Sequence, residues 1–202
     1  MKVIGITGGV GAGKSRILHF LEEAFHARVF EADRAGHQVM EPGTEAFREI
    51  RRVFGEGILG DDGGIDRRAL GEIVFSSQEK RACLNGIIHP AVKKMAVEEI
   101  VRAREEGETS LFVIEAALLI EDRYEEICEE LWYIYADREV RRERLRASRG
   151  YSDEKITAVF ESQLSDERFR EHCRAVIDNS GPIEIAYRQI RDLLGEAFPT
   201  TD

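Results

Sequence analysis

Short runs of mainly apolar residues recur along the chain, and each is followed by a turn or by residues that favour a helix start. Five of them have the length and the β-branched or aromatic content of buried strands. They are Val3–Ile6, Val29–Asp33, Leu111–Glu115, Leu131–Tyr135 and Ala175–Asp178. Between them, apolar residues recur at helical spacing, as Ile17, Leu18 and Leu21 do after the first run. This succession of strands and helices predicts an α/β protein.

The eight residues from Gly8 to Ser15 follow the first expected strand and match the pattern G-x-x-x-x-G-K-[ST] of a P-loop. Glycines let successive backbone N–H groups turn inward and bind an anion, and the following helix adds the positive end of its dipole. In this pattern Lys14 reaches the β- and γ-phosphates, and the Ser15 hydroxyl ligates Mg²⁺. The alternative is a glycine-rich turn without a ligand. The strand before the loop and the helix after it favour nucleoside triphosphate binding.

Residues from about 34 to 105 differ from the rest, because their pattern is almost entirely helical and contains no strand. Helix starts are expected at Thr44–Glu45, at Asp66 and at Ser76 or Ser77. We expect His89–Pro90 to end one helix, and a further helix to follow and to end near Gly107. This block therefore indicates a helical substrate-binding insertion in a nucleotide-binding core.

Acidic residues end the second and third expected strands. Ligands of open parallel sheets bind at the carboxyl ends of strands, so Asp33 is expected to face the phosphate region. Asp33 is also a candidate N-cap for a helix that starts at Arg34, and both roles are compatible. Glu115 follows four apolar residues. An acid at the end of such a strand commonly faces a magnesium site and often contacts the ion through a water molecule. The alternative for Glu115 is a strand-end acid that caps a turn.

Arginines are concentrated in the twelve residues from Arg138 to Arg149. A run of charges is usually a solvated helix face, and this remains one interpretation. The other is a lid over the phosphates, because arginine can fork around phosphate oxygens and neutralise a phosphoryl group during transfer.

Composition narrows the class of protein further. The 202 residues suit one domain with an insertion or a lid, and 43% hydrophobic with 34% charged residues is typical of a soluble globular protein. A net charge of −10 argues against nucleic-acid binding. Three widely spaced cysteines without a C-x-x-C pair indicate reduced thiols. We expect a cytoplasmic protein, because Met1-Lys2 leads directly into a strand. The most apolar stretch, Leu111–Ile120, has ten residues including Glu115, and is too short and too polar at its middle to cross a membrane.

In order and spacing, these motifs resemble those of the dephospho-coenzyme A kinase family over essentially the whole chain. The matching segments are the P-loop I-G-I-T-G-G-V-G-A-G-K-S, Glu31–Asp33 (D-A-D), Arg67–Phe75 (R-x-x-L-x-x-x-x-F), Leu84–Pro90 (L-N-x-x-x-H-P), Ala117–Glu121 (P-L-L-[FV]-E) and Val176–Asn179 (V-I-D-N). Arg144 and Arg149 fall at the family's lid arginines, and Gln163 matches a glutamine in the helix that follows. The P-loop alone identifies a superfamily, whereas the series of motifs indicates this family.

The resemblance implies a P-loop NTPase three-layer α/β fold with a parallel sheet, a helical substrate-binding insertion and an arginine-rich lid. It places the core at about residues 1–33, 106–137 and 166–202 of a single domain. The acceptor-binding insertion is then expected at about 34–105 and the lid at about 138–165.

The implied reaction is the ATP-dependent phosphorylation of the 3′-hydroxyl of dephospho-CoA, the last step of coenzyme A synthesis. Asp33, Lys14 and Arg144 are the expected catalytic residues, with Asp33 orienting or deprotonating the hydroxyl. The expected ATP-binding residues are Gly9, Val10, Gly11, Ala12, Gly13, Lys14, Ser15, Arg16, Arg149 and Asn179. The expected contacts of dephospho-CoA are Asp33, Arg67 and His89. The expected ligand of Mg²⁺ is Ser15, and Glu115 is a second candidate. No nucleic acid, membrane or obligate protein partner is expected.

Several positions depart from the family pattern. Glu31 stands where aspartate is usual, Arg16 replaces a threonine, Ala117 replaces a frequent proline, and Cys173-Arg174 stands where Ala-Asp is common. None of them removes a residue that the chemistry requires.

Two other functions share parts of this pattern. One is a kinase for nucleoside monophosphates or another small alcohol, which would have the same core, insertion and lid. The other is a nucleotide-dependent switch protein, against which the chain lacks an N-K-x-D guanine signature. A panel of acceptors separates these functions.

Overall fold

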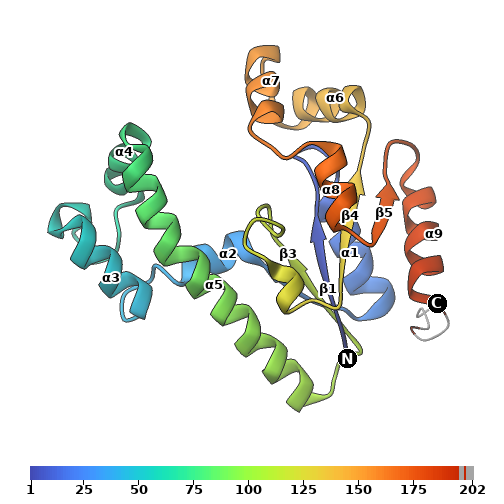
Figure 1. Ribbon diagram of the computed structural model, residues 1–202, viewed down its shortest axis with the longest axis horizontal. Helices are drawn as coiled ribbons and strands as arrows, with labels where there is room; N and C mark the ends of the chain where they lie inside the picture. The colour runs from blue at the N-terminus through green and yellow to red at the C-terminus, as the bar shows by residue number, and fades with distance from the viewer. Residues whose placement is uncertain (196–197, 199–202) are drawn as a thin grey trace. The chain divides into compact units, whose positions relative to one another are not determined.

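A computed structural model describes residues 1–195 and 198, so the expected core boundary at residue 202 lies outside the described residues. Five strands form one sheet in the order β2-β3-β1-β4-β5 (Figure 1). Their bounds are β1 Lys2–Thr7, β2 Arg28–Glu31, β3 Leu111–Glu115, β4 Glu130–Tyr135 and β5 Ala175–Asp178. The pairs β1–β3, β1–β4 and β4–β5 are parallel. The expected α/β class with a parallel sheet is confirmed.

The chain divides into two compact units, one from Met1–Phe30 with the chain from Ile100 onward, the other Glu31–Glu99. In the first unit the helices are α1 Lys14–Phe25, α6 Arg138–Arg149, α7 Asp153–Glu161, α8 Asp166–His172 and α9 Ile183–Leu194, with a short 3₁₀ turn at Tyr124–Glu126. In the second they are α2 Ala32–Gln38, α3 Glu45–Phe54 and α4 Arg67–Ser76, with a 3₁₀ turn at Glu56–Ile58. α5, Gln78–Glu106, has residues on both sides of the division.

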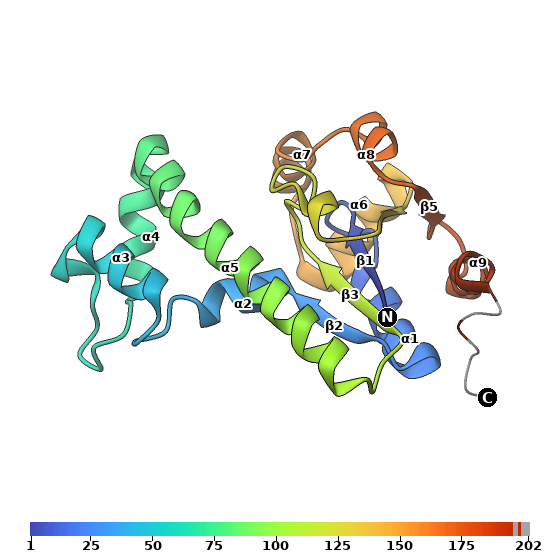
Figure 2. The same ribbon diagram turned by 60° about the horizontal axis from the view of Figure 1, so that its bottom comes forward.

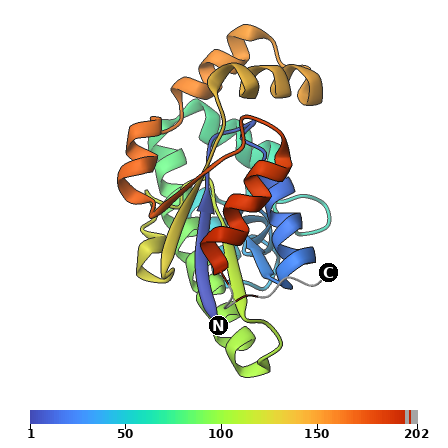
Figure 3. The ribbon, with the colours of Figure 1, turned by 90° about the vertical axis from the view of Figure 1, so that its right-hand side faces the viewer.

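The sheet of the first unit is covered on both faces, which explains why its strands are almost wholly apolar. α1 and α9 lie on one face, and α8 with the 3₁₀ turn lies on the other (Figure 3). On the first face, strand residues such as Ile6 and Ile134 join Leu21 of α1 and Ile190 of α9 in one buried cluster. On the second face, Tyr133 stacks on Phe169 of α8 with ring centres 4.6 Å apart. The end of β1, where the P-loop starts, is therefore fully buried at Ile6 and Thr7.

The second unit is a small helical body with its own core. α3, α4 and the first part of α5 lie side by side (Figure 2), and Ile50, Ile58, Leu70 and Leu84 are buried between them. Within the described residues, one isolated antiparallel bridge, between Leu59 and Ile65, lies outside the named strands. The helical character expected for this stretch is confirmed.

Pro90 does not end a helix, contrary to the expectation from His89–Pro90. α5 continues through it for 29 residues. A proline inside a helix removes one hydrogen bond, at a cost of about 3 kcal/mol. Here the affected carbonyl belongs to Gly86, which is exposed and can bind water instead. Burial of Leu84 before the proline and of Val92 and Ala96 after it holds the two halves in one helix.

β2 is shorter than expected and ends at Glu31, so Asp33 lies in the first turn of α2 and not at the strand end. The N-cap of α2 is Glu31. The interpretation of Asp33 as a helix N-cap is therefore wrong. The β-branched signal stops at Val29, and the small residues Ala32 and Ala35 let a helix start at once.

The other expected helix starts are confirmed by side-chain caps. The Thr44 hydroxyl accepts from Phe47 N at 3.0 Å, and Asp66 Oδ1 accepts from Arg68 N at 2.8 Å. Of the two serines considered, Ser77 is the cap of α5, because its hydroxyl accepts from Lys80 N at 3.2 Å. Cys83, Cys128 and Cys173 are free thiols, as expected. No helix among the described residues is long and apolar enough to cross a membrane.

Candidate active site

The P-loop lies between β1 and α1, and its lysine bends back over it. Gly13 adopts the left-handed region with φ 91° and forms the N-cap of α1, so that the helix begins at Lys14. Lys14 Nζ donates to the Gly8 carbonyl oxygen at 2.8 Å and lies 3.5 Å from Glu115 Oε1. A cation, a helix N-terminus and turned backbone amides together make this an anion-binding site.

Other elements approach the loop so closely that its glycines admit no side chain. A Cβ on Gly13 would lie 2.4 Å from Asn179 Nδ2, and a Cβ on Gly9 would lie 2.2 Å from Arg141 Nη2. Real Cβ atoms essentially never make non-bonded contacts under 3.0 Å. These two glycines are therefore needed for packing against Asn179 and Arg141, apart from any contact with phosphate.

Arg144 lies against the outer side of the same loop. Its Nη2 donates to the Asn179 carbonyl oxygen at 2.8 Å, and its Nη1 donates to the Ala12 carbonyl oxygen at 3.3 Å. Burial, followed by the nearby charge of Arg16, lowers the pKa of Arg144 below its ordinary value. The guanidinium stays charged at neutral pH, because the ordinary pKa of arginine exceeds 12. A cation thus lies next to the loop on the side of α6.

Asn179 connects the end of β5 to the loop. It is 2% exposed, and its Nδ2 donates to the Ala12 carbonyl oxygen at 2.7 Å. Its Oδ1 is buried and has no hydrogen-bond partner among the described residues. In this structure its side chain positions the loop, and its expected contact with ATP stays a prediction.

The arginine run divides between two environments. Arg141 and Arg144 contact the loop, whereas Arg142 and Arg146 form ion pairs with Asp153 at the start of α7. Arg149 lies over the ring of Tyr151, with its guanidinium carbon 5.9 Å from the ring centre. Some members of the run therefore contact the loop and others pair with Asp153, and the role of the run as a lid stays a prediction.

The expected magnesium contacts lie at the same end of the sheet. Ser15 is exposed in the first turn of α1, and Glu115 ends β3 beside Lys14. No group of three His, Cys, Asp or Glu side chains in the described part of the chain could hold a metal by itself. One hydroxyl and one nearby carboxylate fit Mg²⁺, which usually keeps several waters and takes phosphate oxygens as its other ligands.

The second unit carries the other three expected residues. Asp33 is exposed in the first turn of α2, and Arg67 is exposed in the first turn of α4, next to its cap Asp66. His89 is partly buried in the middle of α5. They are described within their unit alone, so their roles toward a substrate stay predictions.

The parallel sheet, the loop with its lysine and the arginines of α6 define a P-loop kinase. A sequence profile of the dephospho-CoA kinase family matches residues 2–184. The chain belongs to the dephospho-CoA kinase family.

Individual relatives agree with this assignment. The chain is 38% identical over 199 residues to the dephospho-CoA kinase of Geobacter sulfurreducens, covering 98% of this chain and all of the relative. It is 37% identical over 193 residues to that of Bacillus licheniformis, covering 95% and 94% of the two chains.

Solved structures show the same fold. A protein from Thermus thermophilus is 31% identical with a TM-score of 0.78, and 96% of each chain is covered. The dephospho-CoA kinase of Campylobacter jejuni, at 22% identity and a TM-score of 0.71 over 98% of each chain, shows the fold alone. A shikimate kinase from Acinetobacter baumannii also shares only the fold, with a TM-score of 0.54, 15% identity and coverage of 96% of this chain and 93% of that one.

The sequence did not indicate Arg141 as a site residue. It indicated Gln163 only through the match to a glutamine of the family. Both contact the loop. A usable signal was present for Arg141, because it precedes Arg144 by three residues and Leu145 by four, which places all three on one helix face.

Proposed function

We propose that this enzyme transfers the γ-phosphoryl group of ATP to the 3′-hydroxyl of dephospho-CoA, giving coenzyme A and ADP. The observation that carries the proposal is Lys14, held between the Gly8 carbonyl and Glu115 at the P-loop of a chain from this family. We further propose that it acts in the cytoplasm, with ATP and dephospho-CoA as its binding partners.

The loop would bind the triphosphate. The backbone N–H groups of Gly11 and Gly13, the N-terminus of α1 and the Lys14 ammonium supply the positive potential that phosphates require, whereas the N–H groups of Val10 and Ala12 already donate within the protein. Lys14 would exchange its contacts with Gly8 and Glu115 for phosphate oxygens. This exchange is favourable because a phosphate carries more charge than the carbonyl and the single carboxylate it replaces.

Asp33 is proposed to orient the acceptor hydroxyl and to take its proton as the hydroxyl attacks the γ-phosphorus. A carboxylate in this role contributes about 10²- to 10⁴-fold to the rate. Its exposure in the first turn of α2 leaves the carboxylate accessible to a substrate. The oxygen–phosphorus bond to the acceptor forms as the bond to ADP breaks, and the leaving oxygen keeps the electron pair.

Arg144 is proposed to neutralise charge that develops on the transferring group. It is already fixed at the loop by the Ala12 and Asn179 carbonyls, so little side-chain entropy is lost when phosphate binds. Arg16 and Arg149 would add to the positive field around ATP, and Asn179 would border its base.

Ser15, with Glu115 nearby, is proposed to hold Mg²⁺ together with phosphate oxygens and water. Held there, the ion would supply positive charge that reduces the repulsion between the phosphates and an attacking hydroxyl. Glu115 also accounts for the resting position of Lys14, whose ammonium it partly neutralises.

The helical unit is proposed to bind dephospho-CoA through Arg67 and His89, and residues at about 138–165 to act as a lid that excludes water. Arg67 begins α4, on which Phe75 is 85% exposed. An exposed cation and an exposed aromatic ring on one helix suit an acceptor that carries phosphates and a purine.

A panel of acceptors tests this proposal. The purified protein is incubated with ATP and Mg²⁺, and ADP is measured with dephospho-CoA, with nucleoside monophosphates, with shikimate and without acceptor. ADP formation that depends on dephospho-CoA, together with a product phosphorylated at the 3′ position, supports the proposal. Turnover with a nucleoside monophosphate alone, or slow hydrolysis that no acceptor accelerates, would overturn it in favour of the two alternatives.

A further inference from the structure

Arg141 on α6 is almost completely buried, with 9% of its surface exposed. Its Nε donates to the Val10 carbonyl oxygen at 3.0 Å, and its Nη2 donates to Gln163 Oε1 at 2.6 Å. The same Gln163 oxygen accepts from the backbone N–H of Val10 at 3.3 Å. Both backbone groups of one P-loop residue are therefore held by one pair of side chains.

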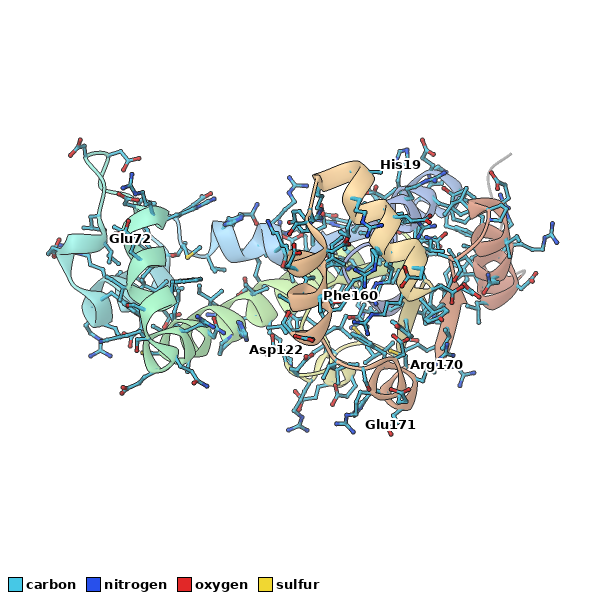
Figure 4. All side chains as sticks on the ribbon, turned by 90° about the horizontal axis from the view of Figure 1, so that it is seen from above. His19, Glu72, Asp122, Phe160, Arg170 and Glu171 are labelled. Carbon is cyan, nitrogen blue, oxygen red and sulfur yellow. The ribbon has the colours of Figure 1, made fainter. Side chains whose placement is uncertain are left out.

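The charge of Arg141 lacks a carboxylate partner within ion-pair distance among the residues that the structure covers. It contacts a carbonyl, an amide oxygen and the face of the Phe160 ring, 4.4 Å from the guanidinium carbon (Phe160 is labelled in Figure 4), while the Asp166 carboxylate acts on it only from beyond ion-pair distance. Burying a cation without a counter-ion in contact is unfavourable, and an anion in the adjacent loop would offset that cost. The arrangement is thus expected to be most stable when a polyphosphate is bound.

The loop is shaped to receive this side chain. Gly9 is the residue whose Cβ would meet the guanidinium, and the Arg141 carbonyl lies 3.0 Å from where a Cβ of Gly11 would be. Two glycines of the motif therefore permit α6 to approach. Packing of this kind fixes a loop more firmly than hydrogen bonds to solvent-exposed groups would.

We propose that Arg141 and Gln163 are positioning residues for the bound triphosphate. They hold Val10 so that the following backbone N–H groups stay directed at the phosphates, and the Arg141 charge strengthens the field there. Arg141 lies in the first half of α6, and Gln163 follows α7. The segment between them, residues 142–162, is therefore attached to the loop at each of its two ends. This inference rests on the proposed binding of ATP, and it does not depend on the identity of the acceptor.

The role of Gln163 gives the sharper test, because only its acceptor oxygen is used in these contacts. Gln163→Glu keeps an acceptor for both donors, and although its charge offsets part of that of Arg141, it should raise the Kd for ATP with Mg²⁺ by no more than about threefold over the parent protein. Gln163→Leu removes the acceptor and should raise that Kd about tenfold or more. The Kd for ATP is measured by calorimetry in the absence of dephospho-CoA and of any other phosphoryl acceptor. Equal Kd values for the glutamate and leucine variants would overturn the proposal.

Arg141→Met tests the other partner and should weaken ATP binding by about 10- to 100-fold while the KM for the acceptor stays unchanged. The matched control is Arg146→Met, which removes an arginine of the same helix that pairs with Asp153. The rise in Tm produced by ATP with Mg²⁺ is measured for both, because a merely structural role would lower Tm without changing that rise. A normal rise for Arg141→Met would contradict the proposal, and if this variant does not fold, the two Gln163 variants decide.

Failure of this inference can be told from failure of the proposed function. If the parent protein binds ATP but phosphorylates no dephospho-CoA, the proposed reaction is wrong and the binding test still applies. If it phosphorylates dephospho-CoA while the Gln163 variants bind ATP equally, only the positioning role is wrong.

Discussion

The Lys14 ammonium lies 3.5 Å from Glu115 Oε1, so the cation of the P-loop and the acid at the end of β3 form an ion pair. The pair connects the start of α1 to the end of β3, which lies beside β1 in parallel register with Ile6 opposite Glu115. The arrangement keeps the lysine at the phosphate site and prevents it from extending into solvent.

Lys14→Ala should lower kcat/KM for ATP by at least about 100-fold, because it removes the cation closest to the expected phosphates. The fold should persist, with a change in Tm of only a few degrees, since the Lys14 side chain is not part of the apolar core. Steady-state kinetics and thermal unfolding measure the two effects. Lys80→Ala, on the exposed start of α5, serves as the control. Near-normal turnover of Lys14→Ala would rule out the P-loop assignment.

Asp33→Asn should reduce kcat by about 10²- to 10⁴-fold while the KM for ATP changes by less than about threefold. The side chain keeps its size and loses its ability to take a proton. Initial rates at varied ATP and varied dephospho-CoA separate the two parameters. An unchanged kcat would leave Asp33 with no more than a favourable charge in the first turn of α2.

Acid should destabilise the protein partly through Glu130. Burial raises the pKa of this carboxyl, but hydrogen bonds from Trp132 and Lys2 outweigh burial and hold it below its ordinary value. Because the folded-state pKa is the lower one, the stabilisation is complete above the ordinary pKa of about 4.3. It is then lost as pH falls from there through the folded-state pKa.

Glu130→Gln should therefore lose about 1 kcal/mol of unfolding free energy at pH 7 and show a shallower fall in stability below about pH 5. Urea unfolding at several pH values provides the measurement. Glu161→Gln, at an exposed position on α7, should leave the pH profile unchanged. A profile that is identical in the parent and Glu130→Gln would contradict the assigned pKa direction.

One of the three cysteines should react with a thiol reagent in the native protein. Cys83 is exposed, whereas Cys128 and Cys173 are buried, and burial raises the pKa of Cys173 to about 12. Thiolate is the reactive form, so Cys173 should be inert at pH 8. Titration with Ellman's reagent should release about one equivalent natively and about three in guanidinium. Cys83→Ser should remove the native signal, and fast release of more than one equivalent would show that a buried thiol is accessible.

The elements of the sheet could be predicted closely, because buried parallel strands are short apolar runs with clear ends. β3 and β5 have the predicted bounds, and Ser77, Asp66 and Thr44 cap their helices as their side-chain chemistry indicates. The error at Pro90 arose because local helix propensity does not include the burial of both flanking halves.

The candidate site was harder to predict where long-range packing decides. The P-loop is a contiguous motif, so Lys14 and Ser15 could be found from local sequence. Arg141 and Gln163 contact the loop from 131 and 153 residues away, and Arg141 differs locally from Arg142, which faces Asp153, only by its helical spacing to Arg144 and Leu145. Only the geometry of α6 separates the two arginines.

Trp132, fully buried in β4 with its indole N–H on Glu130, also determines how the folding of this protein can be observed. It is the sole tryptophan, and all five tyrosines also fall outside residues 31–99. Ultraviolet-excited emission therefore reports on the sheet-containing unit, whereas the helical unit contributes to circular dichroism at 222 nm and is nearly silent in fluorescence. Superimposed melting curves from the two spectroscopic methods would mean that both units unfold in one cooperative step, and separated curves would give each unit its own stability.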